Sequence, residues 1–129
     1  MSEYIVVIDT SEIREGKLPE LKAALGDLAG FVEANEPRPI AYQAYIDEGE
    51  RRMTVLQVHP DPASMEFHME VAASAFPGFA DLLELRTMDV YGEPSEKLID
   101  QLRRKATMLG DVDLVVHQRQ AGFTRFRVG

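Results

Sequence analysis

Apolar residues in the first part of the chain form a strand-like run followed by a helix-like stripe. Residues 4–8 read Tyr-Ile-Val-Val-Ile, a β-branched run that predicts a strand with both faces covered. Apolar residues then recur three, four and seven positions apart, which predicts one face of a helix. Pro19 suits the first turn of this helix, and Pro37 requires it to end near Asn35.

A hairpin, a second helix and a further strand follow in the pattern. Residues 40–46 and 53–59 alternate as two strands should, and residues 47–50 between them, Asp-Glu-Gly-Glu, suit a hairpin turn. A second apolar stripe begins after Pro62 and predicts another helix. Residues 86–91 read as a fourth strand.

This order of elements indicates the fold class. Strand, helix, strand, strand, helix, strand is the ferredoxin-like arrangement, so residues 1–92 are expected to form an α+β domain with two helices on one face of a sheet. The first two strands carry apolar residues on both faces. The face without helices therefore needs a cover, and a second copy of the sheet is the simplest candidate, so we expect a homodimer.

Residues 93–129 are expected to be an extension of that domain. Ser95 suits an N-cap, and an apolar stripe after it predicts a helix with Gly110 just past its C-terminal end. Residues 112–118 predict a strand, and residues 123–128 predict a final short one. We expect the extension to pack on its own domain or on the partner subunit.

Composition narrows the possible functions. A chain of 129 residues suits one domain, and the absence of cysteine excludes disulfides, thiolate metal sites and a cysteine nucleophile and fits a reducing cytoplasm. A net charge of −8 disfavours nucleic acid and anionic lipid as partners. There is no visible signal peptide and no apolar stretch near the ~20 residues of a membrane helix. We therefore expect a cytoplasmic protein that binds neither nucleic acid nor membrane.

Several short segments are similar to one known family. They are Arg14-Glu15-Gly16-Lys17 before the first helix, Asn35-Glu36-Pro37 leading to Tyr42-Gln43-Ala44-Tyr45, the strand Arg52-Met53-Thr54-Val55-Leu56-Gln57-Val58-His59, and Ser64-Met65-Glu66-Phe67-His68-Met69. In this order they resemble the antibiotic biosynthesis monooxygenase domain of the dimeric α+β barrel superfamily. The resemblance covers residues 4–91.

The resemblance implies a fold and an activity. Two subunits would pack sheet against sheet, with a pocket between the sheet and the helices of each. Members that are enzymes resemble oxygenases that work without a bound cofactor on electron-rich aromatics such as quinols and anthrones. This chain lacks the Trp that some active relatives use, and no second histidine follows His68 in its helix, which disfavours haem degradation.

His68 is the first candidate for catalysis. It shares a helical face with Met65 and Met69, so it is expected to point inward. Near neutral pH it could act as a general base or an orienting donor. The alternative is a helix histidine satisfied by a nearby carbonyl, and the resemblance, in which a histidine is common here, favours the functional interpretation.

Four further residues are candidates for substrate binding: Asn35, Tyr45, Gln57 and His59. Tyr42 and Tyr45 have opposite parity, so one can line a pocket and the other an interface. A strand-end histidine before a proline is more often partly exposed than functional, which weighs against His59. The three histidines are not at metal-ligand spacing, so no metal site is predicted.

Together these observations lead to a functional prediction with one alternative. The prediction is a cofactor-independent monooxygenase acting on a small electron-rich aromatic compound. The alternative is a non-catalytic dimeric module of the same fold that binds a small ligand or only assembles, since fold alone cannot choose. A buried pocket holding His68 would favour the enzyme, and a pocket filled by Met65, Phe76 and Phe79 would favour the module.

Overall fold

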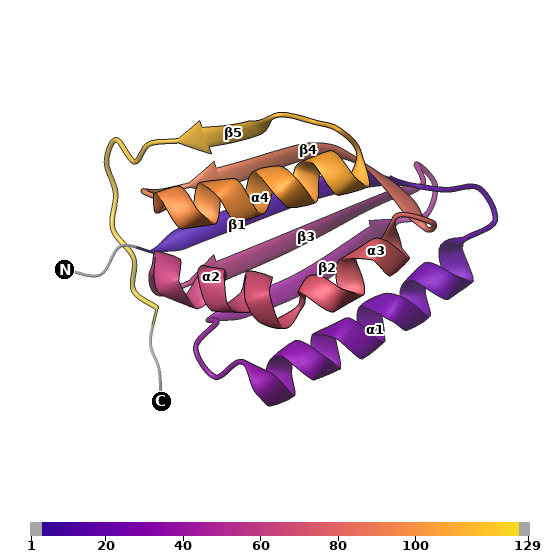
Figure 1. Ribbon diagram of the computed structural model, residues 1–129, viewed down its shortest axis with the longest axis horizontal. Helices are drawn as coiled ribbons and strands as arrows, with labels where there is room; N and C mark the ends of the chain where they lie inside the picture. Colours follow the sequence, from indigo (N-terminus) through magenta and orange to yellow (C-terminus); the bar gives the residue numbers. More distant parts are fainter. Residues whose placement is uncertain (1–3, 127–129) are drawn as a thin grey trace.

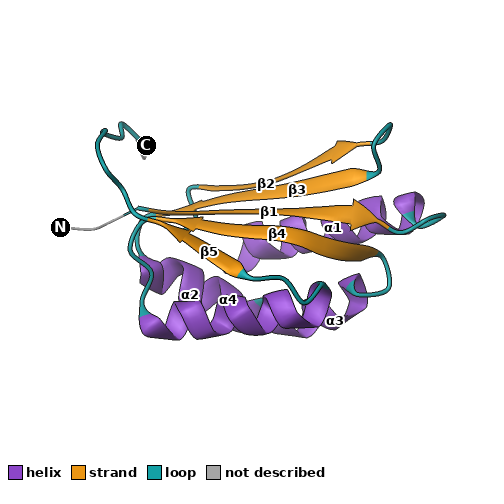
Figure 2. Ribbon diagram, turned by 90° about the horizontal axis from the view of Figure 1, so that it is seen from above, coloured by secondary structure: helices purple, strands orange, loops and turns teal. Residues whose placement is uncertain are grey.

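A computed structural model of the protein describes residues 4–126 and consists of one five-stranded sheet with all helices on one face (Figure 1, Figure 2). The strand order is β2-β3-β1-β4-β5. The elements are β1 (Ile5–Ile13), α1 (Leu18–Asn35), β2 (Ala41–Asp47), β3 (Arg52–His59), α2 (Pro62–Val71), η1 (Ala73–Ala75), α3 (Phe76–Phe79), β4 (Leu83–Tyr91), α4 (Glu96–Leu109) and β5 (Leu114–His117).

The predicted ferredoxin-like α+β fold is confirmed. Strand β1 pairs antiparallel with both β3 and β4, and β2 pairs antiparallel with β3, so the first four strands have the ferredoxin-like order. Helix α4 then returns the chain so that β5 adds to the sheet parallel to β4. None of the helices within residues 4–126 is long and apolar enough to cross a membrane.

Strand β1 is longer than the apolar run that predicted it. The run ends at Ile8, whereas the strand continues to Ile13 because it is paired on both sides along its length. Its inward positions stay buried by strict alternation, and this alternation brings Asp9 and Ser11 to the face that carries the helices. Two polar side chains therefore enter the interior from the middle of the sheet.

Strand β4 carries an irregularity beside these polar residues. Thr10 pairs with Thr87 and Ser11 pairs with Leu85, so Arg86 is an extra residue in the ladder. Such a bulge changes the direction of neighbouring side chains and is common next to functional sites. The strand also begins at Leu83, three residues earlier than the pattern predicted.

The extension packs on the sheet and helices of its own chain. Ser95 is the predicted N-cap, and its hydroxyl accepts a hydrogen bond from the Leu98 amide at 3.1 Å. Residues 123–126 do not form the predicted last strand, and residues 127 and 128 of that prediction lie outside the described part of the chain. Instead, the Phe126 ring packs edge-on against Tyr4, with centroids 5.2 Å apart.

The face of the sheet without helices, called the open face below, is largely uncovered in the single chain (Figure 2). By alternation it carries Val6 and Ile8 of β1 and Leu56 of β3, all half-buried. The Tyr45 side chain, also on this face, is 56% exposed. This is the face for which the sequence predicts a second copy as the cover.

Gly110 ends α4, as predicted, but for a different physical reason. Its φ is −175°, which any residue can adopt, and the left-handed conformation belongs to Asp111 at φ 52°. A Cβ atom on Gly110 would lie 2.1 Å from the carbonyl oxygen of Leu85. The glycine is required because α4 approaches the backbone of β4 closely here.

Replacing this glycine should therefore destabilise the protein. We expect Gly110→Ala to lower the free energy of unfolding by more than about 2 kcal/mol, because backbone atoms must move apart. Gly26→Ala is the control: a Cβ there meets no atom within 4 Å, and alanine should raise stability by up to about 1 kcal/mol in an exposed helix interior. Urea unfolding measures both, and a Gly110→Ala protein as stable as the wild type would contradict this explanation.

Candidate functional site

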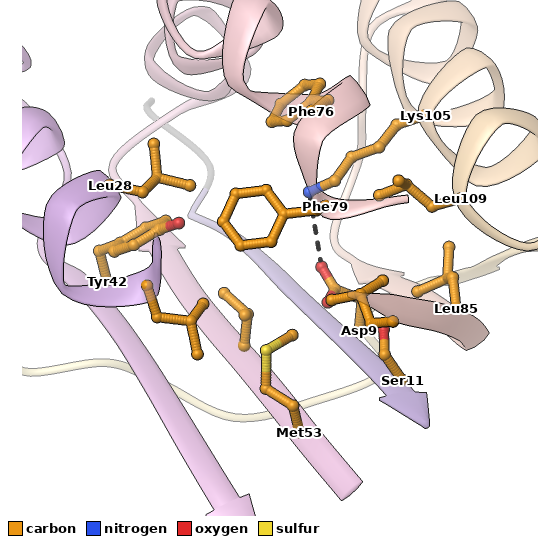
Figure 3. A pocket seen from close by; sticks show the side chains of 13 residues that line it. Asp9, Ser11, Leu28, Tyr42, Met53, Phe76, Phe79, Leu85, Lys105 and Leu109 are labelled. Atoms are coloured by element: carbon orange, nitrogen blue, oxygen red, sulfur yellow. Dashed lines mark ion pairs between the residues drawn. The ribbon is translucent and has the colours of Figure 1, made fainter. Parts of the chain in front are cut away.

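A cavity of about 30 Å³ lies between the sheet and the helices and is called the interior cavity below (Figure 3). This volume suits about one or two water molecules. Its walls are mostly apolar, with four polar or charged side chains among them. The lining residues are Asp9, Ser11, Leu25, Leu28, Tyr42, Met53, Val55, Phe76, Phe79, Leu83, Leu85, Lys105 and Leu109.

Asp9 is the most unusual of these residues. It is 3% exposed, and its Oδ2 atom has no hydrogen-bond partner among the described residues. Burial raises the pKa of the Asp9 carboxyl, while the charges of Lys105 and His68 oppose that rise. A carboxyl group with a raised pKa that lines an apolar cavity is a candidate general base or acid.

Lys105 provides the charge that faces this carboxyl. Its Nζ lies 3.7 Å from Asp9 Oδ2, and Figure 3 shows the two side chains pointing toward each other from α4 and β1. The ammonium group also lies 4.7 Å from the centroid of the Phe76 ring, a cation–π distance. The Lys105 side chain is 12% exposed, so a cation from the extension reaches the interior.

Tyr42 adds a hydroxyl group to the same cavity. Burial, followed by the negative charges of Asp9 and Glu36, raises the pKa of Tyr42 above its ordinary range. The phenol therefore stays protonated and can donate a hydrogen bond at any physiological pH. Of the two tyrosines with opposite parity, the structure places Tyr42 inside and Tyr45 on the open face.

His68 is buried next to this cavity but does not line it. Its Nδ1 lies 2.9 Å and 3.0 Å from the two carboxyl oxygens of Glu36, which is itself buried. A carboxylate accepts from Nδ1–H, which in a neutral imidazole leaves Nε2 as the basic nitrogen. The Tyr42 ring, which lines the cavity, has its centroid 5.5 Å from that of the imidazole. The inward orientation expected for His68 is observed, and its catalytic role stays a prediction.

His59 and Gln57 form a second buried polar group. His59 Nε2 lies 3.0 Å from Gln57 Oε1 and donates to it, and Nδ1 accepts from the Ser64 hydroxyl at 2.8 Å. Burial lowers the pKa of His59 to about 3, so the ring is neutral. The partial exposure expected for a strand-end histidine is wrong. Because both of its nitrogens already have partners, His59 is better suited to holding the start of α2 than to binding a ligand.

The last predicted binding residue, Asn35, lies outside this interior group. It is exposed at the end of α1, where its side chain donates to the Phe31 carbonyl at 2.9 Å. The structure thus brings Gln57, His59 and His68 together in the interior and keeps Asn35 and Tyr45 at the surface. Within residues 4–126, no three His, Cys, Asp or Glu side chains are grouped so that they could hold a metal ion.

The two charged residues of the interior cavity were missed at the sequence level, although each leaves a signal. Asp9 continues the inward parity of Ile5 and Val7, so a longer strand would have placed it inside. Lys105 lies seven residues after Leu98, on the buried stripe of its helix. A charged residue at a core position is the signal that both share.

The state of His59 makes a prediction about stability and pH. Its pKa in the folded protein, about 3, lies below the ordinary value of 6.5, so its contribution to stability is present above pH 6.5 and is lost as the pH falls toward 3. Relative to His59→Gln, the wild type should lose up to about 1.4 kcal/mol of unfolding free energy per pH unit in that range. Urea unfolding at several pH values measures this difference. Parallel curves for the two proteins would contradict the neutral buried state.

Comparison with known proteins places this geometry on a known fold. No protein-family model matches the chain, and no curated protein matches it. Among solved structures, MupZ from Pseudomonas fluorescens superposes with a TM-score of 0.73 at 16% identity, over 95% of this chain and 94% of MupZ. This coverage includes most of the extension.

Two other similar structures match a shorter part of the chain. A putative antibiotic biosynthesis monooxygenase from Caulobacter crescentus CB15 has a TM-score of 0.60 at 22% identity, over 69% of this chain and 86% of that protein. One of the same description from Bacteroides thetaiotaomicron VPI-5482 has a TM-score of 0.56 at 22% identity, over 64% and 84%. The chain therefore has the antibiotic biosynthesis monooxygenase fold. Most of its extension also has a counterpart in the structure of MupZ.

Proposed function

We propose that this protein is an enzyme that removes a proton from a small electron-rich aromatic substrate, with Asp9 as the base, and so prepares that substrate for reaction with dioxygen without a bound cofactor. One observation carries the proposal: a buried carboxyl with an unbonded oxygen faces the ammonium group of a lysine in a mostly apolar cavity. The oxygen step is supported by the fold shared with proteins named as monooxygenases.

The proposed reaction starts with proton transfer to Asp9. The CH₂ group of an anthrone, which lies between two aromatic rings and across the central ring from the ketone, gives up one proton to the carboxylate and becomes a carbanion stabilised as its phenolate form. Dioxygen adds to that carbon, and the peroxide takes the proton back from Asp9. Loss of water breaks the O–O bond and removes the second C–H proton. One CH₂ group and one O₂ thus become one C=O group and one H₂O.

Lys105 and Tyr42 would hold the negative charge that develops on the substrate oxygen. An ammonium group and a phenol that stays protonated are both donors, and in a cavity shielded from water such donors stabilise an anion strongly. The apolar walls would admit dioxygen and exclude competing water. The Glu36–His68 pair, behind Tyr42, would serve as a second proton-handling group instead of the primary base.

The size of the interior cavity favours a second candidate, the non-catalytic module. About 30 Å³ does not hold an aromatic ring, His68 does not line the cavity, and Phe76 and Phe79 do. Under the enzyme proposal the cavity must open for the substrate. Under the module proposal Asp9 and Lys105 are a structural ion pair, and substitution of Asp9 should cost stability.

Substitution of Asp9 separates these two candidates. We expect Asp9→Asn to reduce oxygen uptake with a panel of hydroquinones and anthrones at least about 100-fold, because the base is lost. We expect Lys105→Met to reduce it by a similar order, because an anion-stabilising donor is lost. His68→Gln should have a smaller effect. Oxygen-electrode assays on the metal-stripped proteins measure all three.

The stability of the same variants provides the control. Asp9→Asn should leave the free energy of unfolding at pH 7 unchanged or raise it by up to about 1 kcal/mol, because a strained functional charge is removed. The folded pKa of Asp9 is raised, so this carboxyl favours the folded state most below pH 3.8 and loses that advantage as the pH rises. Asp81→Asn, an exposed aspartate outside the cavity, should change neither property. A loss above about 2 kcal/mol in Asp9→Asn would support the module.

The active form is proposed to be a homodimer that pairs two open faces. These faces carry half-buried Val6, Ile8 and Leu56 and the exposed ring of Tyr45. Packing two such sheets together would bury these apolar side chains.

A charge on the open face should therefore prevent dimerisation. We expect Tyr45→Asp to be a monomer at micromolar concentration, because it would bury an unpaired carboxylate between the sheets. Phe67→Asp is the matched control: that ring is 45% exposed, but it lies on α2 on the helical side of the sheet. Sedimentation equilibrium gives both masses, and a monomeric wild type would overturn the dimer.

A further inference from the structure

We propose that a groove between α1 and the segment η1–α3, called the outer groove below, binds a small neutral aromatic molecule, and that Phe79 and Leu28 form the partition between this groove and the interior cavity. Figure 1 shows α1 lying alongside α3. The inference rests on the proposed function in one respect, that the bound molecule is the substrate on its way to Asp9.

The outer groove has the size and lining of a ligand site. Its volume is about 430 Å³, within the range typical of small-molecule pockets. Its lining is apolar apart from one carboxylate and one hydroxyl group. The lining residues are Ala24, Asp27, Leu28, Phe31, Val71, Ala72, Ser74, Ala75, Gly78, Phe79 and Leu82.

Two side chains connect the groove to the interior cavity. Leu28 and Phe79 line both spaces, so one side of each contacts the groove and the other contacts the cavity. Figure 3 shows the Phe79 ring between Tyr42 and Asp9. A benzene ring needs a cavity of about 150 Å³, far more than the interior cavity provides. If the Phe79 ring turns away, the two spaces join and Asp9 comes within reach of a molecule in the groove.

The other wall of the groove, helix α1, is held by few buried residues. Only Leu21, Leu25 and Val32 of the eighteen residues of α1 are buried. A Cβ atom built on Gly26 or Gly30 would meet no atom within 4 Å, so these positions of α1 face open space. Few buried contacts indicate a low local free energy of opening. Helix α1 can therefore move outward, with Leu28, to admit a ligand.

The charges around the groove indicate the class of ligand. Asp27 is exposed and is the one charged residue among those that line the groove. A carboxylate repels an anionic ligand and accepts a hydrogen bond from a neutral hydroxyl group. A neutral phenol or quinol with a fused aromatic system fits this lining better than a carboxylated or phosphorylated compound.

A binding experiment with 1-naphthol tests the groove independently of turnover. Titration into ¹⁵N-labelled wild-type protein should give saturable amide shifts in residues 24–31 and 71–82, with a Kd below about 1 mM. Gly78→Trp should weaken binding at least about tenfold, because a Cβ at Gly78 meets no atom within 4 Å and the new ring would fill the groove. Gly78→Leu makes the same test with a smaller side chain.

Gly26→Trp is the matched control, since that glycine is equally open but does not line the groove. It should bind 1-naphthol as the wild type does, and so should Asp9→Asn. No saturable shift, shifts confined to the open face, or unchanged binding by both Gly78 variants would each overturn the groove. If binding follows these expectations but Asp9→Asn retains oxygen uptake, the result supports ligand binding in the outer groove and contradicts the role of Asp9 as the base.

Discussion

The candidate site is organised around one costly feature, the burial of a carboxyl group in the middle of the central strand. Asp9 is surrounded by apolar side chains, and its nearest cation lies 3.7 Å away without a hydrogen bond to Oδ2. Burial of a carboxylate costs free energy, and the ammonium group of Lys105 offsets that cost in part. An asparagine at this position would avoid that cost. The cost is understandable when the carboxyl group does chemistry that a neutral side chain cannot do.

Two elements position the charged groups of the site: β1 carries Asp9, and α4 carries Lys105. Strand β1 is paired on both sides, so the backbone of Asp9 cannot shift without breaking two ladders. The opposing charge comes from the long side chain of Lys105 on α4. The structure of MupZ matches 95% of this chain, whereas that of the protein from Caulobacter crescentus CB15 matches 69% of it. The segment after β4 thus supplies the charged group that faces Asp9.

The sequence was sufficient for the fold because local signals agreed with the tertiary structure. Pro19 and Pro37 indicate where α1 begins and ends. The alternation of apolar and polar residues predicts the hairpin, and it predicts that Tyr42 and Tyr45 point to opposite faces of the sheet. The site was harder to predict. The polar residues after Ile8 indicate the end of a strand near Asp9, whereas pairing on both sides extends the strand to Ile13. That Lys105 faces Asp9 depends on the packing of α4 over the cavity, and the sequence does not predict this tertiary contact.

The role proposed for Asp9 is tested most directly by measuring the pKa of its carboxyl group in the folded protein. A ¹³C NMR titration of its side-chain carboxyl group gives the midpoint without any assumed substrate. We expect a midpoint above the ordinary value of 3.8, and a still higher midpoint in Lys105→Met, because the ammonium group lowers the pKa. A midpoint at or below 3.8 would show a carboxylate stabilised as a structural anion and would contradict its role as a base.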